Sequence, residues 1–262
     1  MSYLRLIDTH CHLNLAEAFP DAASEIEAAR EVGVDRMIII GIDVETSLAA
    51  IRLAEAHDGL FASVGWHPNH ANDYRPDSLR LLSDMLAHPK VVAVGETGLD
   101  YHWDRATPLQ QHGAFTDQLD LAHEAGLPVV IHGRDAYPAL MDVLEVQTKM
   151  NGTGRYLLHC FAGDETDADR AAALGCYFGV DGPVTYKNAA DLRAILAHLD
   201  PKRILIETDS PYLPPMPHRG KPNRPSYLPL INSGLAQVLG ISPEACAELT
   251  TQNAEQFFQL KV

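Results

Sequence analysis

The chain has 262 residues, with 20 Lys and Arg against 35 Asp and Glu, so its formal net charge is -15 at pH 7. This acidic balance excludes a protein that coats nucleic acid through a broad basic surface, but it permits a small site that contacts a few phosphates. The sequence has no run of about 18 apolar residues that would span a membrane, and its first residues lack a secretory signal pattern. The four cysteines form no CxxC pair, which favours a reduced, cytoplasmic setting.

Short apolar runs rich in Val, Ile and Leu alternate along the chain with longer amphipathic stretches. The runs predict strands, in chain order, at Leu4–Asp8, Arg36–Ile42, Leu60–Val64, Val91–Glu96, Pro128–His132, Tyr156–His159, Cys176–Val180 and Arg203–Thr208. Apolar positions at helical spacing predict helices that include Ala22–Val32, Thr46–His57, Pro108–Ala125 and Ala189–Leu199. Eight such units predict an α/β fold, a single-domain (β/α)8 TIM barrel over residues 1–262, with an open doubly wound sheet as the alternative.

One segment differs in composition from the rest of the chain. Residues 210–229 contain a cluster of prolines together with Arg219, Lys221 and Arg224, and they include no acidic residue. Proline removes a backbone donor and interrupts both helix and sheet. We therefore expect a long ordered loop after the last strand.

The predicted strands end in side chains that bind metals, and in a barrel of this kind the chemistry lies at the carboxyl ends of the strands. His10 and His12 share one face, because side chains alternate along extended backbone. The same alternation predicts an inward-facing residue at the ends of four further strands, namely Glu96, His132, His159 and Asp209. A buried carboxylate is costly unless it is paired or bound to a metal. Four imidazoles and two carboxylates form a donor set suited to divalent cations.

Glu96 is predicted to lie at the middle of this set. It is assigned to the inward face because it has the same parity in its strand as Val92 and Val94. Six ligands exceed what one tetrahedral ion requires, so we expect two ions, with Glu96 as the carboxylate that bridges them.

The residues around these positions form motifs that occur in one collinear order. They are Asp8-Thr-His-Cys-His-Leu13, Val64-Gly-Trp-His-Pro68, Val94-Gly-Glu-Thr-Gly-Leu-Asp100, Leu127-Pro-Val-Val-Ile-His-Gly-Arg134, His159-Cys-Phe-Ala-Gly163, Glu207-Thr-Asp-Ser-Pro-Tyr-Leu213 and His218-Arg-Gly-Lys-Pro-Asn-Arg-Pro225. With this set, the chain resembles the TatD family of metal-dependent deoxyribonucleases, in particular its YcfH-like branch, within the amidohydrolase-like hydrolases. The motifs cover nearly the whole chain, and their order makes the resemblance specific.

The resemblance implies a (β/α)8 barrel and a centre of two divalent ions (Zn, Mg or Mn) at the six positions above. It also implies phosphodiester hydrolysis by activation of a water, as a 3′-5′ exonuclease or general DNase acting on single-stranded DNA or on 3′ ends. One alternative is a metal-dependent esterase or amidase, such as an enzyme that deacylates D-aminoacyl-tRNA. The other is a non-catalytic binding protein on the same scaffold. Neither a membrane nor an obligate protein partner is expected.

Roles for individual residues complete the hypothesis. One ion would be held by His10, His12, Glu96 and Asp209, and the other by Glu96, His132 and His159. Asp209 and Glu96 are the predicted catalytic residues, with Asp209 as both ligand and proton acceptor, whereas Glu207 orients a ligand. The predicted substrate contacts are His67, Arg134, Arg219 and Arg224. Trp66 and Tyr101 are weaker candidates for stacking on bases, and Cys11 and Cys160 are interpreted as small packing residues.

Overall fold

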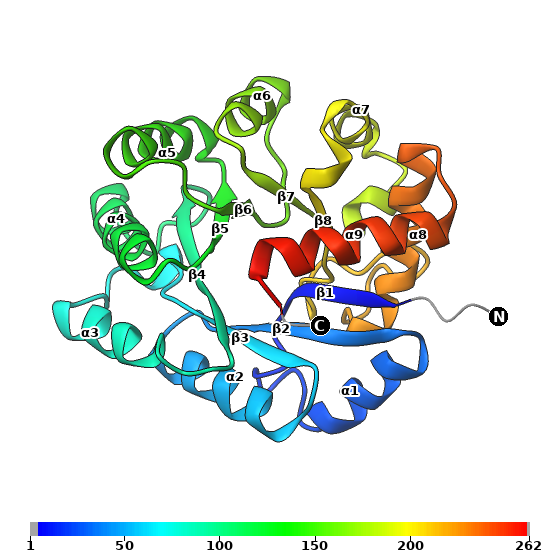
Figure 1. The fold of residues 1–262 in the computed structure, drawn as a ribbon, viewed down its shortest axis with the longest axis horizontal. Helices are drawn as coiled ribbons and strands as arrows, with labels where there is room; N and C mark the ends of the chain where they lie inside the picture. Colours follow the sequence, from blue (N-terminus) through cyan, green and yellow to red (C-terminus); the bar gives the residue numbers. More distant parts are fainter. Residues whose placement is uncertain (1–4, 261–262) are drawn as a thin grey trace.

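The computed structural model describes residues 5–260 and contains one parallel eight-stranded sheet with helices outside it (Figure 1). The strands are β1 Leu6–Cys11, β2 Val34–Ile40, β3 Leu60–Val64, β4 Val91–Asp100, β5 Val129–Arg134, β6 Tyr156–Leu158, β7 Tyr177–Val180 and β8 Ile204–Ile206. The α-helices are α1 Ala22–Glu31, α2 Val44–Ala56, α3 Pro76–Met85, α4 Pro108–Ala125, α5 Tyr137–Asn151, α6 Glu165–Ala173, α7 Ala190–His198, α8 Leu228–Leu239 and α9 Pro243–Phe258. Short 3-10 turns lie at Pro68–His70, Gly182–Thr185, Pro201–Arg203 and Pro225–Tyr227.

The predicted barrel is confirmed. Each strand pairs in parallel with the next one along the chain, from β1 through to β8, and helices occupy the connections. A doubly wound sheet would reverse its strand order near the middle, so that alternative is wrong. None of the helices within residues 5–260 combines the length and the apolar character needed to cross a membrane.

Element boundaries differ from the predictions where tertiary pairing overrides local pattern. β1 continues to Cys11, and Leu4 of its predicted range lies outside the described residues. β4 runs on to Asp100, because its last residues pair with β5 despite two glycines. α4 has the predicted bounds, since Thr107 caps its first turn through a capping box and Gly126 ends it with φ 65°. In the proline-rich segment, the chain has no helix or long strand up to Arg224, and its last residues form the 3-10 turn Pro225–Tyr227 and the start of α8.

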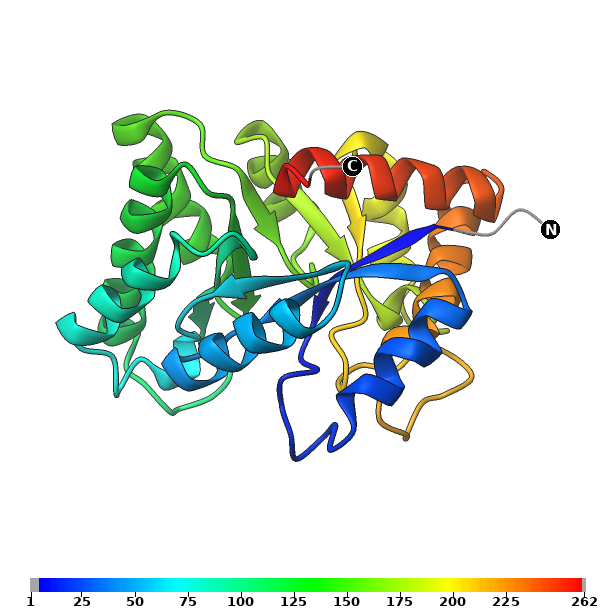
Figure 2. The same ribbon diagram turned by 60° about the horizontal axis from the view of Figure 1, so that its bottom comes forward.

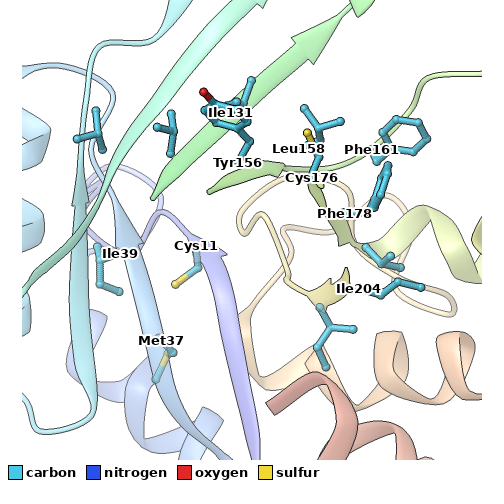
Figure 3. Close-up of a cluster of buried hydrophobic side chains, with 14 of the residues drawn as sticks. Cys11, Met37, Ile39, Ile131, Tyr156, Leu158, Phe161, Cys176, Phe178 and Ile204 are labelled. Atoms are coloured by element: carbon cyan, nitrogen blue, oxygen red, sulfur yellow. The ribbon is translucent and has the colours of Figure 1, made fainter. Parts of the chain in front are cut away.

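Two apolar clusters surround the strands. One fills the barrel from the inside and includes Ile7, Ile38, Val130, Leu157 and Leu205. It also includes Phe257 of α9, the helix that lies beside β1 and β8 across the end of the barrel (Figure 1). The other lies between the strands and the outer helices, and Figure 3 shows part of it. With one end covered by α9, the polar strand ends gather at the other.

The prediction that Val94 shares the inward face of β4 with Glu96 is wrong. Ala93 belongs to the interior cluster, whereas Val94 packs in the outer cluster. Simple alternation along the strand therefore does not place Glu96 on the inside. The ladder to β5 shifts register between Val94 and Thr97, and Gly95 within that shift has φ 136°. This irregularity, and not strict alternation, turns Glu96 towards the mouth of the barrel.

The barrel closes between its first and last strands through few backbone contacts. Within residues 5–260, an isolated bridge joins Cys11 to Ser210, just beyond β8. The N–H of Asp209 donates to the carbonyl of His10 at 2.8 Å, and that of His12 donates to the carbonyl of Ser210 at 2.9 Å. The loops that follow β1 and β8 therefore lie side by side below the barrel in Figure 2.

A buried carboxylate strengthens this seam. Asp8 accepts hydrogen bonds from the hydroxyl of Thr208 at 2.6 Å and from its N–H at 2.9 Å. Burial raises the pKa of Asp8 to about 7, and the bonds from Thr208 oppose that rise. The side chains of Asp8 and Thr208 thus replace part of the missing backbone ladder.

Replacing Thr208 with valine is expected to lower the free energy of unfolding by about 1–3 kcal/mol, because the buried Asp8 carboxyl loses a donor that water cannot replace. Urea denaturation measures the change. Thr116→Val is the control, since the Thr116 hydroxyl bonds only to the carbonyl of His112 in its own helix. Equal stabilities for the two variants would contradict a structural role for the Asp8–Thr208 pair.

Candidate metal centre

The structure brings all six predicted ligands together at the carboxyl ends of the strands. His10 and His12 come from the end of β1, Glu96 lies within β4, and the other three residues are His132 in β5, His159 just after β6 and Asp209 just after β8. The ring of His10 stacks on that of His159 with 3.7 Å between centroids, so two strands from opposite parts of the sequence meet here. His132 is half-buried and the other five are buried.

Four atoms of this set lie near one another. Nε2 of His10 lies 3.2 Å from Nε2 of His12, 3.5 Å from Oε2 of Glu96 and 3.6 Å from Oδ1 of Asp209. Nε2 of His12 lies 3.8 Å and 3.5 Å from the same two oxygens. Ligands bonded at roughly 2.0–2.2 Å to a tetrahedral ion stand about 3.3–3.6 Å apart. The two nitrogens therefore lie near ligand spacing from each other and from both oxygens, and His10, His12 and Glu96 form a group that could hold one divalent ion.

A second set of nitrogens faces the other oxygen of Glu96. Its Oε1 lies 2.9 Å from Nδ1 of His132, 3.3 Å from Nε2 of His159 and 3.4 Å from Nε2 of His67. Glu96 thus presents Oε2 to one group of imidazoles and Oε1 to the other. A carboxylate placed in this way can bridge two ions.

His67 differs chemically from the other imidazoles of this second set. Its Nδ1 accepts a hydrogen bond from the N–H of Asn69 at 3.1 Å, which places the ring's proton on Nε2 when the imidazole is neutral. Burial lowers the pKa of His67 to about 4, although the charge of Glu96 opposes the change. A neutral ring with its proton on Nε2 is a hydrogen-bond donor, so His67 is placed to face an oxygen and not to ligate an ion.

Further carboxylates orient the imidazoles. Oε1 of Glu207 lies 3.0 Å from Nδ1 of His159, which leaves Nε2 of that ring for the centre. Oδ2 of Asp100 lies 3.0 Å from Nε2 of His132, which leaves Nδ1 of that ring for the centre. Metal-bound histidines commonly donate their second nitrogen to a carboxylate in this way. The predicted orienting role of Glu207 agrees with this geometry, whereas the corresponding role of Asp100 was not predicted.

The surroundings of the two carboxylates favour their ionised form. Burial alone would raise the pKa of Glu96, but its interactions with the surrounding imidazoles, including hydrogen bonds to His10 and His132, hold it well below its ordinary value. Burial acts in the same direction on Asp209, and its contacts with His12 and the charge of His159 lower its pKa overall. Metal ligands must be deprotonated, so both carboxylates are in the form that a cation needs. The donor types and the ionised carboxylates fit divalent ions, which would take the place of the protons that the carboxylates favour on His132 and His159.

Replacing Asp100 with asparagine is expected to weaken metal binding by about 10- to 100-fold, because the ring of His132 loses the carboxylate that orients it. Titration of the metal-free protein with Zn²⁺ or Mn²⁺ measures the affinity. Asp77→Asn is the matched control, because the Asp77 side chain is 90% exposed on α3. An unchanged affinity in Asp100→Asn would show that His132 does not need this partner or does not bind the ion.

The arginines predicted to bind substrate occupy different surroundings. The guanidinium of Arg224 pairs with Glu25 of α1 at 3.0 Å, and that of Arg219 lies over the ring of Tyr186 at 4.4 Å. Arg134 is exposed at the end of β5, two residues beyond His132. These contacts with Glu25 and Tyr186 hold the loop after β8, and substrate binding by the three arginines stays a prediction.

Trp66 and the two cysteines next to predicted ligands make packing or polar contacts. Trp66 is half-buried against the outer cluster and donates its ring N–H to the carbonyl of His70, which is a packing role. Cys11 is buried, as expected. Cys160, in contrast, is only half-buried, and its thiol lies 3.2 Å from Oδ2 of the buried Asp181. A cavity of about 850 Å³ between α6 and α7 reaches this pair, and none of the six predicted ligands lines it.

Comparisons with known proteins place the chain in a family. The family model described as TatD related DNase matches residues 7–259. The metal-dependent hydrolase YabD of Bacillus subtilis is 37% identical over 97% of this chain and 99% of its own length. The 3'-5' ssDNA/RNA exonuclease TatD of Edwardsiella piscicida is 35% identical over 97% of this chain and 100% of its own length.

A solved structure leads to the same result. The TatD homologue YjjV of Escherichia coli superimposes with a TM-score of 0.92 and 30% identity, and the match covers 99% of this chain and 100% of that one. Together with the match to the family model over nearly all of the chain, this agreement confirms the resemblance. The chain belongs to the TatD-related DNase family of metal-dependent hydrolases.

Proposed function

We propose that this protein is a two-metal phosphodiesterase that removes nucleotides from the 3′ end of single-stranded DNA. The observation that carries the proposal is the position of Glu96, whose two carboxylate oxygens face two separate groups of imidazoles. In one group, His10 and His12 lie near both Glu96 and Asp209, and in the other the rings of His132 and His159 are oriented by Asp100 and Glu207.

In this proposal His10, His12, Glu96 and Asp209 hold one ion, and Glu96, His132 and His159 hold the other. Two bound divalent ions would supply the activation of a water and the charge that a phosphodiester transition state requires. An imidazole-rich donor set favours zinc over magnesium.

The protein's own groups would position the substrate and move the proton. Asp209, ionised and 7% exposed at the mouth, is placed to accept the proton from the attacking water. Nε2 of His67 is placed to donate a hydrogen bond to a non-bridging oxygen of the phosphate, while its Nδ1 fixes the turn at Asn69.

The choice of nucleic acid as substrate is supported by the relative named a 3'-5' ssDNA/RNA exonuclease, which aligns over its whole length. The acidic chain, with a net charge of -15, predicts few phosphate contacts and therefore attack at a chain end. An esterase that acts on aminoacyl-tRNA would use the same ions, so only a direct comparison of substrates distinguishes the two.

The test is the activity of the purified protein on single-stranded DNA labelled at its 5′ end, with Zn²⁺, Mn²⁺ or Mg²⁺ added in turn. We expect a ladder that shortens from the 3′ end, loss of activity with a chelator, and resistance of the same oligonucleotide when its last 3′ linkage is a phosphorothioate. Metal-dependent release of the amino acid from D-aminoacyl-tRNA, without any cleavage of DNA or RNA, would overturn the proposal in favour of the esterase.

A further inference from the structure

An exposed tryptophan stands beside the metal centre and has no role in the site described so far. Trp103 lies in the loop between β4 and α4, and it is 46% exposed although tryptophan is costly to leave in water. Trp66, by contrast, is half-buried, and the chain contains two tryptophans in all. The exposure of Trp103 therefore calls for a function at the surface.

The loop that carries Trp103 is fixed to the same carboxylate that orients a predicted metal ligand. Oδ1 of Asp100 accepts hydrogen bonds from the N–H of His102 at 3.0 Å and from the N–H of Trp103 at 3.3 Å. Oδ2 of Asp100 lies 3.0 Å from Nε2 of His132. One buried side chain thus holds both the imidazole of His132 and the backbone of the loop that carries the indole, which ties this loop to the centre.

Two arginines accompany the indole. The guanidinium carbons of Arg105 and Arg134 lie 5.7 Å and 5.6 Å from the centre of the Trp103 ring. Among residues 5–260, no carboxylate lies within ion-pair distance of either guanidinium, and the nearby Asp135 contacts His102 instead. In a chain of net charge -15, two cations that have no carboxylate partner within the described residues thus lie over one exposed aromatic ring.

A second exposed aromatic residue stands at the mouth of the barrel. Tyr212, in the loop after β8, is 53% exposed and meets the ring of His12 edge-on with 5.9 Å between centroids. The solvent-exposed surface therefore reaches a predicted metal ligand.

We propose that Trp103, Arg105 and Arg134 form a nucleotide subsite, in which the indole stacks on a base next to the scissile phosphate and the guanidiniums contact the adjoining phosphates. An exposed indole accepts any base, because every base has an aromatic face, and guanidinium groups bind phosphate oxygens in a forked geometry. A base in a duplex is already stacked on its neighbours, so the subsite selects single strands and frayed ends. This inference rests on the proposed function, since it gives the centre its substrate class.

The kinetic test compares Trp103→Ala and Trp103→Phe with the wild-type protein on single-stranded DNA. We expect Trp103→Ala to lower kcat/KM by about 5- to 100-fold and Trp103→Phe to retain most of it, because phenylalanine still stacks. Met150→Ala is the matched control, because Met150 is a 72% exposed apolar residue near the end of α5, away from the strand ends. An equal loss of kcat/KM in Trp103→Phe and Trp103→Ala would contradict stacking of a base on Trp103.

Oligonucleotides that lack one base identify the base that stacks on Trp103. One oligonucleotide has its abasic nucleotide on the 3′ side of the last linkage, and the other has it on the 5′ side. On one of the two, the difference in kcat/KM between the wild type and Trp103→Ala should disappear, because the base that stacks on Trp103 is missing. A full difference on both would show that Trp103 acts on the structure of the loop and would overturn the subsite.

A binding measurement separates this inference from the proposed activity. In a Trp66→Phe background Trp103 is the sole tryptophan, and we expect an all-phosphorothioate single strand to quench its fluorescence, and a duplex of the same length to quench it much less. If the phosphorothioate strand quenches the fluorescence but the phosphodiester form of the same strand is not cleaved, the nuclease proposal is wrong and the subsite is supported. If Trp103→Ala cleaves at the wild-type rate and the strand does not quench the fluorescence of Trp103, the subsite is wrong and the nuclease proposal is unaffected.

Discussion

Asp209→Asn is expected to remove nearly all activity while leaving the barrel folded. The substitution takes away the proposed proton acceptor, and general acid–base groups contribute roughly 10²- to 10⁴-fold to rate. It also replaces a charged ligand that stands 3.5 Å and 3.6 Å from the nitrogens of His12 and His10. The fold is kept because Asp209 has φ 54°, a conformation that asparagine adopts more readily than most residues. Cleavage rates and circular dichroism of the same preparation measure both effects.

The control for Asp209→Asn is Asp200→Asn, a change before β8 at the opposite end of the strand, where the side chain only caps a 3-10 turn. That variant should retain wild-type rates. If Asp209→Asn cleaved at a rate within a few-fold of the wild type, Asp209 would be neither the proton acceptor nor a required ligand. Glu96 would then be the candidate for accepting the proton from the attacking water.

Glu96→Gln is expected to affect both ions at once. The glutamine side chain keeps the shape of glutamate, but an amide NH2 replaces one of the two carboxylate oxygens and cannot ligate a cation. One of the two groups of imidazoles therefore no longer faces an oxygen at this position. The charge of Glu96 also holds up the pKa of His159, which burial alone would lower. We expect a lower metal content and a loss of activity at least as large as that of Asp209→Asn.

Metal analysis of the purified variants checks this prediction directly. Wild-type protein should hold two ions per chain, Glu96→Gln fewer, and Glu45→Gln, an exposed residue of α2, the same number as the wild type. A Glu96→Gln protein that kept both ions would show that the carboxylate does not bridge them. Its activity would then separate binding from catalysis, because the ions would still be in place.

The order of elements was predictable because each strand and helix carries its own local pattern. Parallel strands in a barrel are buried on both faces, so runs such as those of β2 and β3 are almost continuously apolar and stand out. The ends were less predictable, since they depend on a partner. The predicted strand stopped at Glu96, and pairing with β5 extends β4 through Gly98 to Asp100.

The metal-type side chains were predictable because strand ends converge in any parallel barrel, whatever its details. The parity argument worked for His132 and His159, whose strands place Val130 and Leu157 in the interior. It failed for Glu96, which reaches the mouth through a register shift that no alternation rule contains. A correct location was thus reached by an incorrect local argument.

The supporting residues were the least predictable part. Asp100 and Asp181 are buried carboxylates, and nothing in their local sequence marks them as such, because burial is a property of the assembled fold. Trp103 was overlooked for the opposite reason. A loop tryptophan is normally expected to pack, and its exposure became visible only with the surrounding loops in place.

The weak seam between β1 and β8 has a consequence for the time at which activity can begin. His10 and His12 are among the first residues to be synthesised, and Asp209 follows almost 200 residues later, yet the three must meet at one point. A nascent chain that lacks its last strand therefore has neither a closed barrel nor a complete set of ligands. An ion held by these residues would bind only the closed form and would therefore stabilise it. Unfinished or fragmented chains would then lack activity, which would protect the nucleic acids of a cell that makes the nuclease proposed above.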